Sequence, residues 1–567
     1  TLLVDKSLVI ADDGPVGTHY TAMAGMLDGA EHQLRLDRAG TEIDNLRAAF
    51  AWSRENSDAE LALTLAASLL PLWLTRGLFT EGLGWLHAAL SETDDSVAPE
   101  ARVRASVCRV VLESLRFSFV DCDDDKRILA AARELADPAV VARALTACAL
   151  RTGDDRDVSV GYFTEAADVA LQSGDSWWLG QTLVFQAMYE MLFGEPVAGE
   201  AAADQAIRIA TRIGDTFVSR QARYTLGWAQ VLHGSLTDAL DLLGLVEDES
   251  IAARDGLDAM QAASIRAIIL AYQGHVDAAR NASDTAFTRV SDLFDSFTGI
   301  AHGGSAHVYL AAGDAAAAWR AFQMARELTG MDPQWAAMHT WSPLAPLACG
   351  ELAAARKWAD EVVSATRGWA LGSSLLTRSR VRIAQGDSDG AEHDAHDGLD
   401  LAARLKGYLL IPFALDSLGI LATQNGSHLV AVRLFGAADA SRGRLSMARW
   451  TVFDPDYDER LAGLREVLGD NEFSAAWAEG EALTIEEAIA YAQRGRGERR
   501  RATTGWGSLT RAELDVARLV QEGLPNKDIA GRLFISPRTV QAHLTHIFSK
   551  LELTSRVQLA QEASRHG

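Results

Sequence analysis

The residues whose types and spacing could support a function gather near the C-terminal end of the chain. One helical face of the segment 537–551 is polar and carries Gln541, Ala542 and Thr545. A glutamine amide can pair with an adenine through two hydrogen bonds in the major groove of DNA. We therefore expect these three residues to face base edges, with Gln541 the one able to make a two-point contact.

Further polar and basic residues flank this face and are suited to hold the DNA backbone. Phosphate contacts fix the position of a protein on the duplex and carry no sequence information themselves. Lys527 would begin a short preceding helix, and Arg538 would lie in the first turn of the polar one. The residues expected to contact phosphates or to position the domain are Asn526, Lys527, Ser536, Arg538, Thr539, Lys550 and Arg556.

Patterns that would indicate an enzyme or a metal site are weaker. His393 and His396 could bind a metal together, but they fall where a repeated helix should show its solvated side. The aspartates of 121–125 imitate a calcium loop, yet its sixth position is Lys126 and not glycine. The stretch 303–307 lacks the closing glycine of a nucleophile elbow. We predict no enzyme activity, no cofactor and no metal site.

The elements that must position the polar face can be read from the same tail. Thr510 and Glu513 form a capping box that opens a helix, and Gly523 ends it. Asn526 caps a short second helix, and a tight turn then leads to Pro537 at the first position of a third. A short helix, a tight turn and a long helix with an exposed polar half are typical of a helix-turn-helix reader of DNA. The third helix is expected to bury Val540, Leu544, Ile547, Phe548 and Leu551.

Most of the preceding chain follows a repeat of roughly 40 residues. A glycine, usually followed by a polar residue, recurs at successive spacings of 41, 40, 40, 39, 37, 36 and 40 residues. Such a pair predicts a glycine that ends one helix and a residue that caps the next. A second class of breaks lies between these glycines, so each repeat should hold two antiparallel helices. The glycines are Gly153, Gly194, Gly234, Gly274, Gly313, Gly350, Gly386 and Gly426.

This pattern resembles tetratricopeptide repeats, whose units bury their apolar faces on their neighbours. An irregular helical bundle is the alternative. Tryptophans are expected in the repeat core rather than in a ligand cage, as for Trp177, Trp178, Trp228, Trp319 and Trp358.

Composition agrees with a helical chain of several domains. The 567 residues are 48% hydrophobic, with only 12 prolines and four cysteines that form no Cys-x-x-Cys pair. Residues 494–567 hold 13 basic and 7 acidic side chains, whereas the rest of the chain has a net charge of −30. A basic tail on an acidic body indicates that the tail alone meets a polyanion. Because the sequence shows neither a signal peptide nor a membrane span, we expect a cytoplasmic protein.

The tail resembles the LuxR-type helix-turn-helix over roughly 55 residues without a gap. The resemblance implies that 526–545 is the helix-turn-helix proper and that the helix after Thr554 mediates dimerisation. Members of this family often carry lysine at the positions of Gln541 and Thr545, so two cations are missing from the face that reads DNA. The matching residues are Leu509-Thr510, Glu513, Gly523-Leu-Pro-Asn526-Lys527-Asp-Ile529-Ala530, Ile535-Ser536, Thr539-Val540, His543, Lys550-Leu551 and Arg556.

Other stretches resemble the large, ATPase-bearing LuxR regulators of actinobacteria. Residues 36–49 are similar to the helix that follows their nucleotide-binding module, and 433–439 with 473–488 to the segment that closes their repeats. Residues 3–9 are similar to the end of a winged-helix element. No Gly-Lys dipeptide, which a phosphate-binding loop requires, occurs in the chain. Either the ATPase lies upstream of Thr1 in a longer protein, or this version has lost it.

We therefore expect an all-α protein, a TPR-like helical-repeat solenoid followed by a small four-helix LuxR-type helix-turn-helix domain. The expected segments are a remnant of a winged-helix-like element (1–18), a helical connector (19–100), TPR-like repeats (101–440), a helical closing segment (441–493), a basic flexible linker (494–508) and the helix-turn-helix domain (509–567).

The expected function is DNA-binding transcriptional regulation under the control of the repeat region. The expected partners are double-stranded promoter or operator DNA, a second copy of the chain on DNA, a small-molecule or protein ligand in the repeat groove, and RNA polymerase, with no membrane. Two alternatives stay open. The chain could be the C-terminal part of an ATP-dependent regulator, or a scaffold with a weakened DNA-binding domain.

Overall fold

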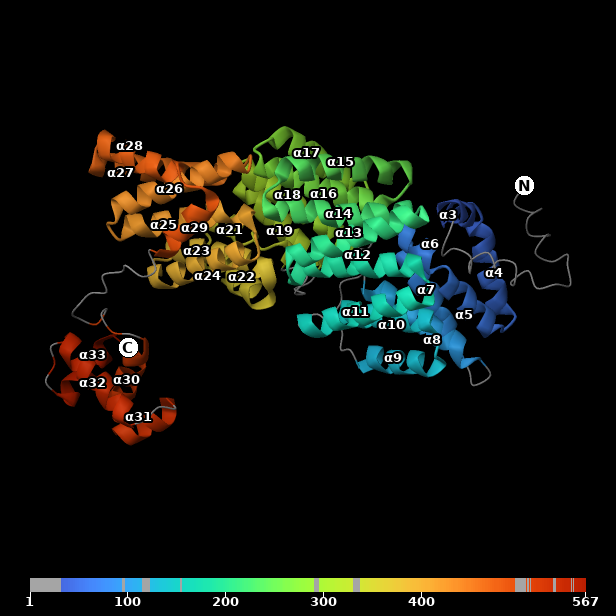
Figure 1. The fold of residues 1–567 in the computed structure, drawn as a ribbon, viewed down its shortest axis with the longest axis horizontal. Coiled ribbons are helices and arrows are strands. Elements are labelled where there is room, and N and C mark those ends of the chain that lie inside the picture. Colours follow the sequence, from blue (N-terminus) through green and yellow to red (C-terminus); the bar gives the residue numbers. More distant parts are fainter. Residues whose placement is uncertain are drawn as a thin grey trace. The chain divides into compact units, whose positions relative to one another are not determined.

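The computed structural model contains two compact units, 1–490 and 491–567, and every regular element that it describes is a helix (Figure 1). The expected winged-helix remnant at 1–18 and most of the expected linker at 494–508 lie outside the described residues. The structure describes residues 32–93, 97–114, 123–152, 155–289, 295–329, 337–494, 511–533, 537–551 and 555–566, together with Trp506, Leu509 and Leu553.

The first unit opens with helices that pack on one another in chain order. They are α3 (His32–Thr41), α4 (Ile43–Glu55), α5 (Ala59–Ser68), α6 (Leu70–Thr75), α7 (Phe79–Ser91), α8 (Pro99–Ser114), α9 (Asp123–Leu135) and α10 (Pro138–Arg151).

Pairs of helices at the predicted interval follow, and each helix packs against the next (Figure 1). The pairs are α11 (Arg156–Ser173) with α12 (Ser176–Phe193), α13 (Pro196–Ile213) with α14 (Thr216–His233), α15 (Leu236–Ala252) with α16 (Gly256–Tyr272), α17 (Val276–Phe287) with α18 (Asp295–Ala311), α19 (Ala315–Thr329) with α21 (Leu344–Ala348), α22 (Leu352–Ala365) with α23 (Gly368–Ala384), and α24 (Ser388–Arg404) with η1 (Tyr408–Leu410) and α25 (Ile411–Gln424).

The repeat glycines end helices as the sequence predicts at six of the seven described positions, where φ lies between 74° and 84°. Gly194 is the exception, because its φ is −116°. The expected caps form where an aspartate stands at the break between two helices, whereas Ser235 and Ser427 make no such bond. An ionised carboxylate also gains from the helix dipole at this end. Caps are made by Asp175, Asp215, Asp255, Asp314 and Asp387.

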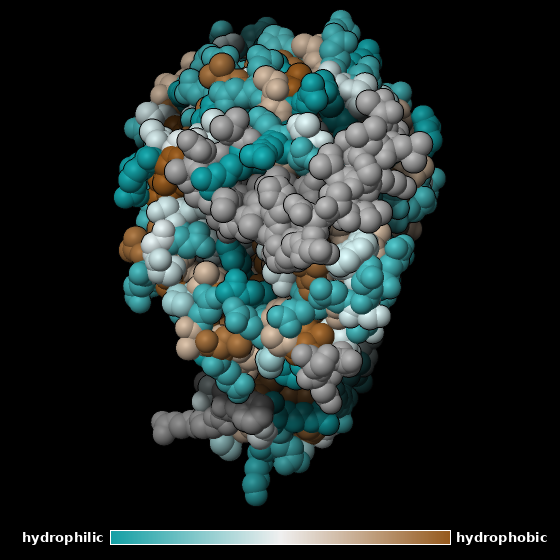
Figure 2. Space-filling model, turned by 90° about the vertical axis from the view of Figure 1, so that its right-hand side faces the viewer, coloured by the Kyte–Doolittle hydropathy of each residue, from teal (hydrophilic) through white to brown (hydrophobic). Residues whose placement is uncertain are grey.

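The tryptophans named above lie in the repeat core, apart from Trp319, which is only partly buried. Trp177, Trp178, Trp228 and Trp358 are each at most 8% exposed. On the face shown in Figure 2, hydrophilic residues prevail and hydrophobic ones form small separate groups. Isolated hydrophobic residues of this kind are normal on a protein surface and do not indicate a docking site.

Contacts between distant repeats close the first unit on itself. The Arg76 guanidinium donates to the Ala253 carbonyl at 2.7 Å, and the Trp369 indole donates to the carbonyl of Met191. These partners lie 177 and 178 residues apart. The stack of helix pairs therefore coils, and one turn of the coil takes just over four repeats of roughly 40 residues.

The first unit ends with helices that fold back on the last repeat helix, α26 (His428–Arg444). Helix α28 packs closely against α26 because glycines meet there. A methyl group at Gly436 would lie 2.6 Å from the Trp477 carbonyl oxygen, and one at Gly480 only 2.1 Å from the Arg433 carbonyl oxygen. The remaining elements are η2 (Thr451–Phe453), α27 (Asp454–Leu468), α28 (Asp470–Glu481) and α29 (Ile485–Arg494).

In the part of the second unit that the structure describes, four helices pack around a core of their own. They are α30 (Arg511–Gln521), α31 (Asn526–Leu533), α32 (Pro537–Leu551) and α33 (Arg556–His566). Gly523, with φ 80°, follows α30 as predicted. Val540, Leu544 and Ile547 are buried, and Phe548 and Leu551 are partly buried against them. Among the described helices of both units, none combines the length and apolar character that a membrane crossing needs.

Candidate nucleic-acid interface

Helix α32 presents two of the predicted base-facing residues on its exposed side. Its buried side packs Val540, Leu544 and Ile547 against α30 and α31. Gln541 and Thr545, one helical turn apart, are exposed on the opposite side. An exposed polar face on the second helix of a helix-turn-helix is the part that enters the major groove.

The Thr545 hydroxyl is already engaged within its own helix. It donates to the Gln541 carbonyl at 3.0 Å, so its methyl group is the part best placed to touch a base. Thr539 is exposed on the same helix. The backbones of Arg538 and Ala542 lie in α32, but their side chains are outside the described residues, and so is all of Ser536.

Asn526 has a different role from the predicted helix cap. The Pro525 carbonyl accepts the first amide hydrogens of α31, from Asp528 at 2.9 Å and Ile529 at 3.1 Å. The Asn526 side chain instead donates to Gln541 Oε1 at 2.9 Å and accepts from Arg556 Nη1 at 2.7 Å. The expected cap is therefore wrong, because Asn526 is the first residue of the helix and its amide joins α31, α32 and α33.

Two of the basic residues expected on phosphates are bonded inside the domain. Lys550 Nζ lies 2.6 Å from Glu513 Oε2, and the Glu513 side chain is only 4% exposed. Arg556 also donates to the Leu524 carbonyl. Glu513 was expected to cap its helix together with Thr510, which lies outside the described residues. Its carboxylate holds Lys550, so Lys550 and Arg556 serve first to join the helices of the domain.

The sequence motifs do not predict the Glu513–Lys550 pair, although the position of Glu513 in the sequence indicates that it is buried. Glu513 lies three, four and seven residues before Val516, Ala517 and Val520, which are all buried. These intervals place Glu513 on the apolar face of α30. A carboxylate in such a position requires a partner, because burying an unpaired charge is costly.

Comparisons with known proteins agree with this geometry. The model of the LuxR family of bacterial regulatory proteins matches residues 507–563. A protein of Mycobacterium bovis that bears the name of an HTH-type transcriptional regulator is 42% identical over 610 aligned positions, which cover all of this chain and 69% of the relative. The chain is a helix-turn-helix transcriptional regulator of the LuxR family.

Other similarities of this LuxR-family regulator are shorter or more distant. The oxygen regulatory protein NreC of Staphylococcus haemolyticus is 47% identical over 55 residues, 10% of this chain and 25% of its own length. A crystal structure of the APC/C hetero-tetramer Cut9–Hcn1 covers 96% of this chain and 98% of its own at 12% identity, with a TM-score of 0.43.

Lys527, like Arg518, has a side chain that bonds to no other described residue of the LuxR-type domain. Its side chain is exposed, and no hydrogen bond or ion pair joins it to a described residue. Arg532, by contrast, pairs with Glu522 at 2.6 Å. The Lys527 side chain is therefore accessible to a polyanion.

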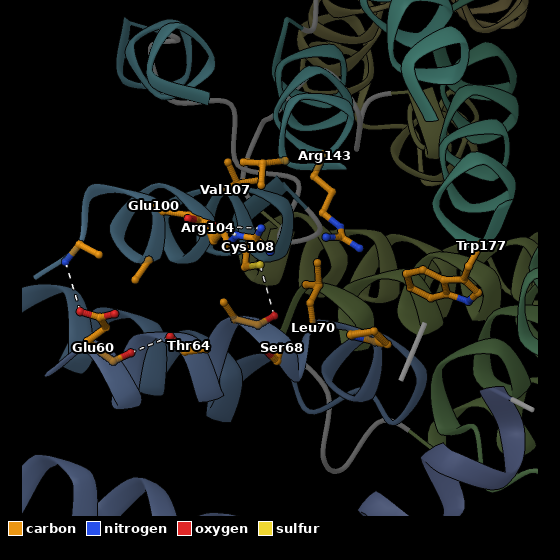
Figure 3. A pocket seen from close by; sticks show the side chains of 15 residues that line it. Glu60, Thr64, Ser68, Leu70, Glu100, Arg104, Val107, Cys108, Arg143 and Trp177 are labelled. Carbon is orange, nitrogen blue, oxygen red and sulfur yellow. Dashed lines mark hydrogen bonds and ion pairs between the residues drawn. The ribbon is translucent and has the colours of Figure 1, made fainter. Parts of the chain in front are cut away.

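The repeat unit of the regulator holds a cavity of about 470 Å³ between α5, α6, α8, α10 and α12 (Figure 3). Leu70, Val107 and Trp177 give it apolar walls, and the guanidinium of Arg143 lies between Val107 and Trp177 in the view of Figure 3. Arg143 also lies over the Trp178 ring, 5.2 Å from its centroid. Pockets of 300–1,000 Å³ with a few polar groups are typical of small-molecule sites.

The histidines considered as metal ligands lie on different sides of α24. His393 is 68% exposed beside Asp397, whereas His396 is 5% exposed. Asp394 is also buried, and it pairs with Arg378 and Arg382. The expectation that this face is solvated is wrong for Asp394 and His396, since both belong to the packed side of the helix.

Proposed function

We propose that two copies of this regulator bind a two-fold operator and read it through Gln541 and Thr545. The exposed position of both residues, opposite the buried Val540 and Leu544, supports this assignment most strongly. A dimer would place two copies of α32 in successive major grooves, one helical turn apart. Ala542, next to Gln541 in α32, completes the proposed reading face.

In this proposal the phosphate contacts fall mainly to Lys527 and Arg538. Lys527 is exposed at the N-terminal end of α31, and Arg538 follows the first residue of α32. We also assign phosphate contacts to the hydroxyl groups of Ser536 and Thr539. Lys550 and Arg556 already have partners in the domain, so we assign them to its architecture.

The protein acts, in this proposal, in the cytoplasm and without a catalytic step of its own. A signal in the repeat unit changes self-association, and the DNA-bound dimer then changes the access or activity of RNA polymerase. Solenoids expose extended surfaces suited to such regulatory contacts.

The cavity of Figure 3 is the proposed binding site for the ligand that gives this signal. Arg143 lies beside apolar walls, and its Nη2 is 3.4 Å from Asp175 Oδ2, a long contact that an organic acid with a hydrophobic body would share or replace. We expect phenylacetate or a similar acid to raise the melting temperature of the full chain, and Arg143→Met to remove the rise. No rise with any hydrophobic acid, or an equal rise in the variant, would contradict this binding site.

A selection from randomised operators tests the reading face. We expect Gln541→Ala to cost about 1–3 kcal/mol at one base pair of each half-site and to relax the preference there. Lys527→Ala, the matched control, should weaken binding to all sequences alike. An unchanged selected sequence with Gln541→Ala, or an altered one with Lys527→Ala, would reverse the assigned roles.

A further inference from the structure

Three side chains from three helices form a hydrogen-bonded relay that ends at the reading face. Arg556, the first residue of α33, donates to Asn526 at the start of α31, and Asn526 donates to Gln541 on α32. The donor–acceptor distances are 2.7 Å and 2.9 Å. The side chain proposed to read DNA is thus held by two others that lie behind it.

The order of donors and acceptors in this relay follows from chemistry. An arginine guanidinium has only N–H donors, so the atom of Asn526 that faces Arg556 must be its carbonyl oxygen. The Asn526 amide nitrogen must then face Gln541. A nitrogen that donates needs an acceptor, and Gln541 can offer only its Oε1. The two ends of an amide are hard to tell apart by shape alone, and here the permanent donor fixes both.

The orientation of the Gln541 amide sets what it can recognise. Oε1 is directed to Asn526, which leaves the two N–H bonds of Nε2 for the exposed side. In the major groove, guanine offers two acceptors, N7 and O6, whereas cytosine offers an amino donor. A glutamine free to turn could instead pair with adenine through both of its ends.

We infer that Arg556 and Asn526 are positioning residues that orient the Gln541 amide so that it reads a guanine. This inference rests on the proposed reading role of Gln541 and makes it specific. The residue that opens α33 thereby acts on base choice without touching DNA.

The decisive variant is Asn526→Asp in the full chain. An aspartate of the same shape still accepts from Arg556, but it can only accept from Gln541. The Gln541 amide must then turn, and its oxygen faces the groove. Selection from randomised operators should show a change of about tenfold in the guanine-to-cytosine ratio at one position per half-site, away from guanine. The added negative charge weakens binding to all bases alike and leaves this ratio untouched.

Three further variants separate the possible failures. Gln541→Glu, at an exposed position, presents only oxygens and should also favour cytosine, with Arg556 and Asn526 left unchanged. Arg556→Ala should relax the preference without reversing it, and Arg556→Lys should restore it. The double variant Asn526→Asp with Gln541→Ala should lose the shift.

If Asn526→Asp weakens binding to all operators equally and leaves the guanine-to-cytosine ratio unchanged, Asn526 and Arg556 do not orient Gln541. A Gln541→Ala variant that keeps the full preference would instead remove the proposed reading role itself. The two failures are therefore distinguishable in the same selection experiment.

Discussion

At the scale of single residues, the basic side chains of the DNA-binding unit fall into two groups. Some are bonded within the unit and stabilise it, and others remain available to DNA. Lys550 and Arg556 have partners in the unit, and Lys527 has none among the described residues. Charge and spacing alone assigned all three to phosphates. Only the packing of α30 against α32 brings Lys550 to Glu513, which is 37 residues away.

Lys550→Ala tests this division. The change leaves the Glu513 carboxylate buried without its cation, and we expect a loss of about 2 kcal/mol in the free energy of unfolding of this unit. Urea unfolding of the full chain, followed by hydrogen exchange of α30 and α32, measures it. Lys527→Ala is the control and should leave stability unchanged.

The salt dependence of DNA binding should show the opposite ranking. Lys527→Ala should lower the slope of log affinity against log salt by about one unit, because one phosphate contact is lost. Lys550→Ala should leave the slope near that of the unchanged chain. Equal slopes for the unchanged chain and Lys527→Ala would place Lys527 away from the phosphates.

At the scale of helices, the sequence predicts the helix pairs well, but it does not predict the contacts between distant repeats. Glycines at a regular interval end helices because a positive φ is needed there, and Gly234 to Gly426 fulfil this. The bonds of Arg76 to Ala253 and of Trp369 to Met191 depend on the curvature that accumulates over four repeats. No local pattern encodes that curvature.

Gly480→Ala tests the close packing of the last helices. The added methyl group would lie 2.1 Å from the Arg433 carbonyl oxygen, so α28 must move away from α26. We expect a loss of about 1–3 kcal/mol in the stability of the first unit. Gly463→Ala on α27 is the control: its methyl group meets nothing within 4 Å, and better helix propensity should make it neutral or stabilising. Equal stability of the two variants would refute the contact.

Buried His307 predicts a pH dependence of the repeat unit. Burial lowers the pKa of His307 to about 4, and its Nδ1 is 2.8 Å from the Gly303 carbonyl oxygen. The unfolded chain binds a proton near pH 6.5 and the folded chain only near pH 4, so stability falls as the pH drops between these values.

His307→Leu should remove part of that fall. The difference in unfolding free energy between pH 7.5 and pH 4.5 should shrink by up to about 2–3 kcal/mol in urea titrations. His393→Leu, at an exposed position on α24, is the control and should keep the full difference. An unchanged pH dependence in His307→Leu would show that the folded chain protonates this histidine as readily as the unfolded chain does.

At the scale of the molecule, the two units carry net charges of opposite sign. The second unit has a net charge of +6 and the first a net charge of −30. The acidic unit repels DNA and the basic one attracts it, so the fragment 491–567 should bind non-specific DNA more tightly than the full chain at 50 mM salt. The difference should shrink at 300 mM salt, where charges are screened over shorter distances. Equal affinities at low salt in fluorescence anisotropy would contradict this prediction.

The distribution of charged residues along the sequence predicts an acidic first unit and a basic second unit. The family resemblances predict the fold of each unit. Neither could show which amide end of Gln541 faces outward. That detail depends on Asn526, which bonds Gln541 from 15 residues away, and on Arg556, which bonds Asn526 from 30 residues away.

Footprinting of the full chain on the DNA upstream of its own gene tests the central claim most directly. We predict one protected site with two half-sites about one helical turn apart, and loss of this protection with Gln541→Ala at the same protein concentration. Protection that extends evenly along the DNA, or that is the same for Gln541→Ala, would contradict sequence reading by α32.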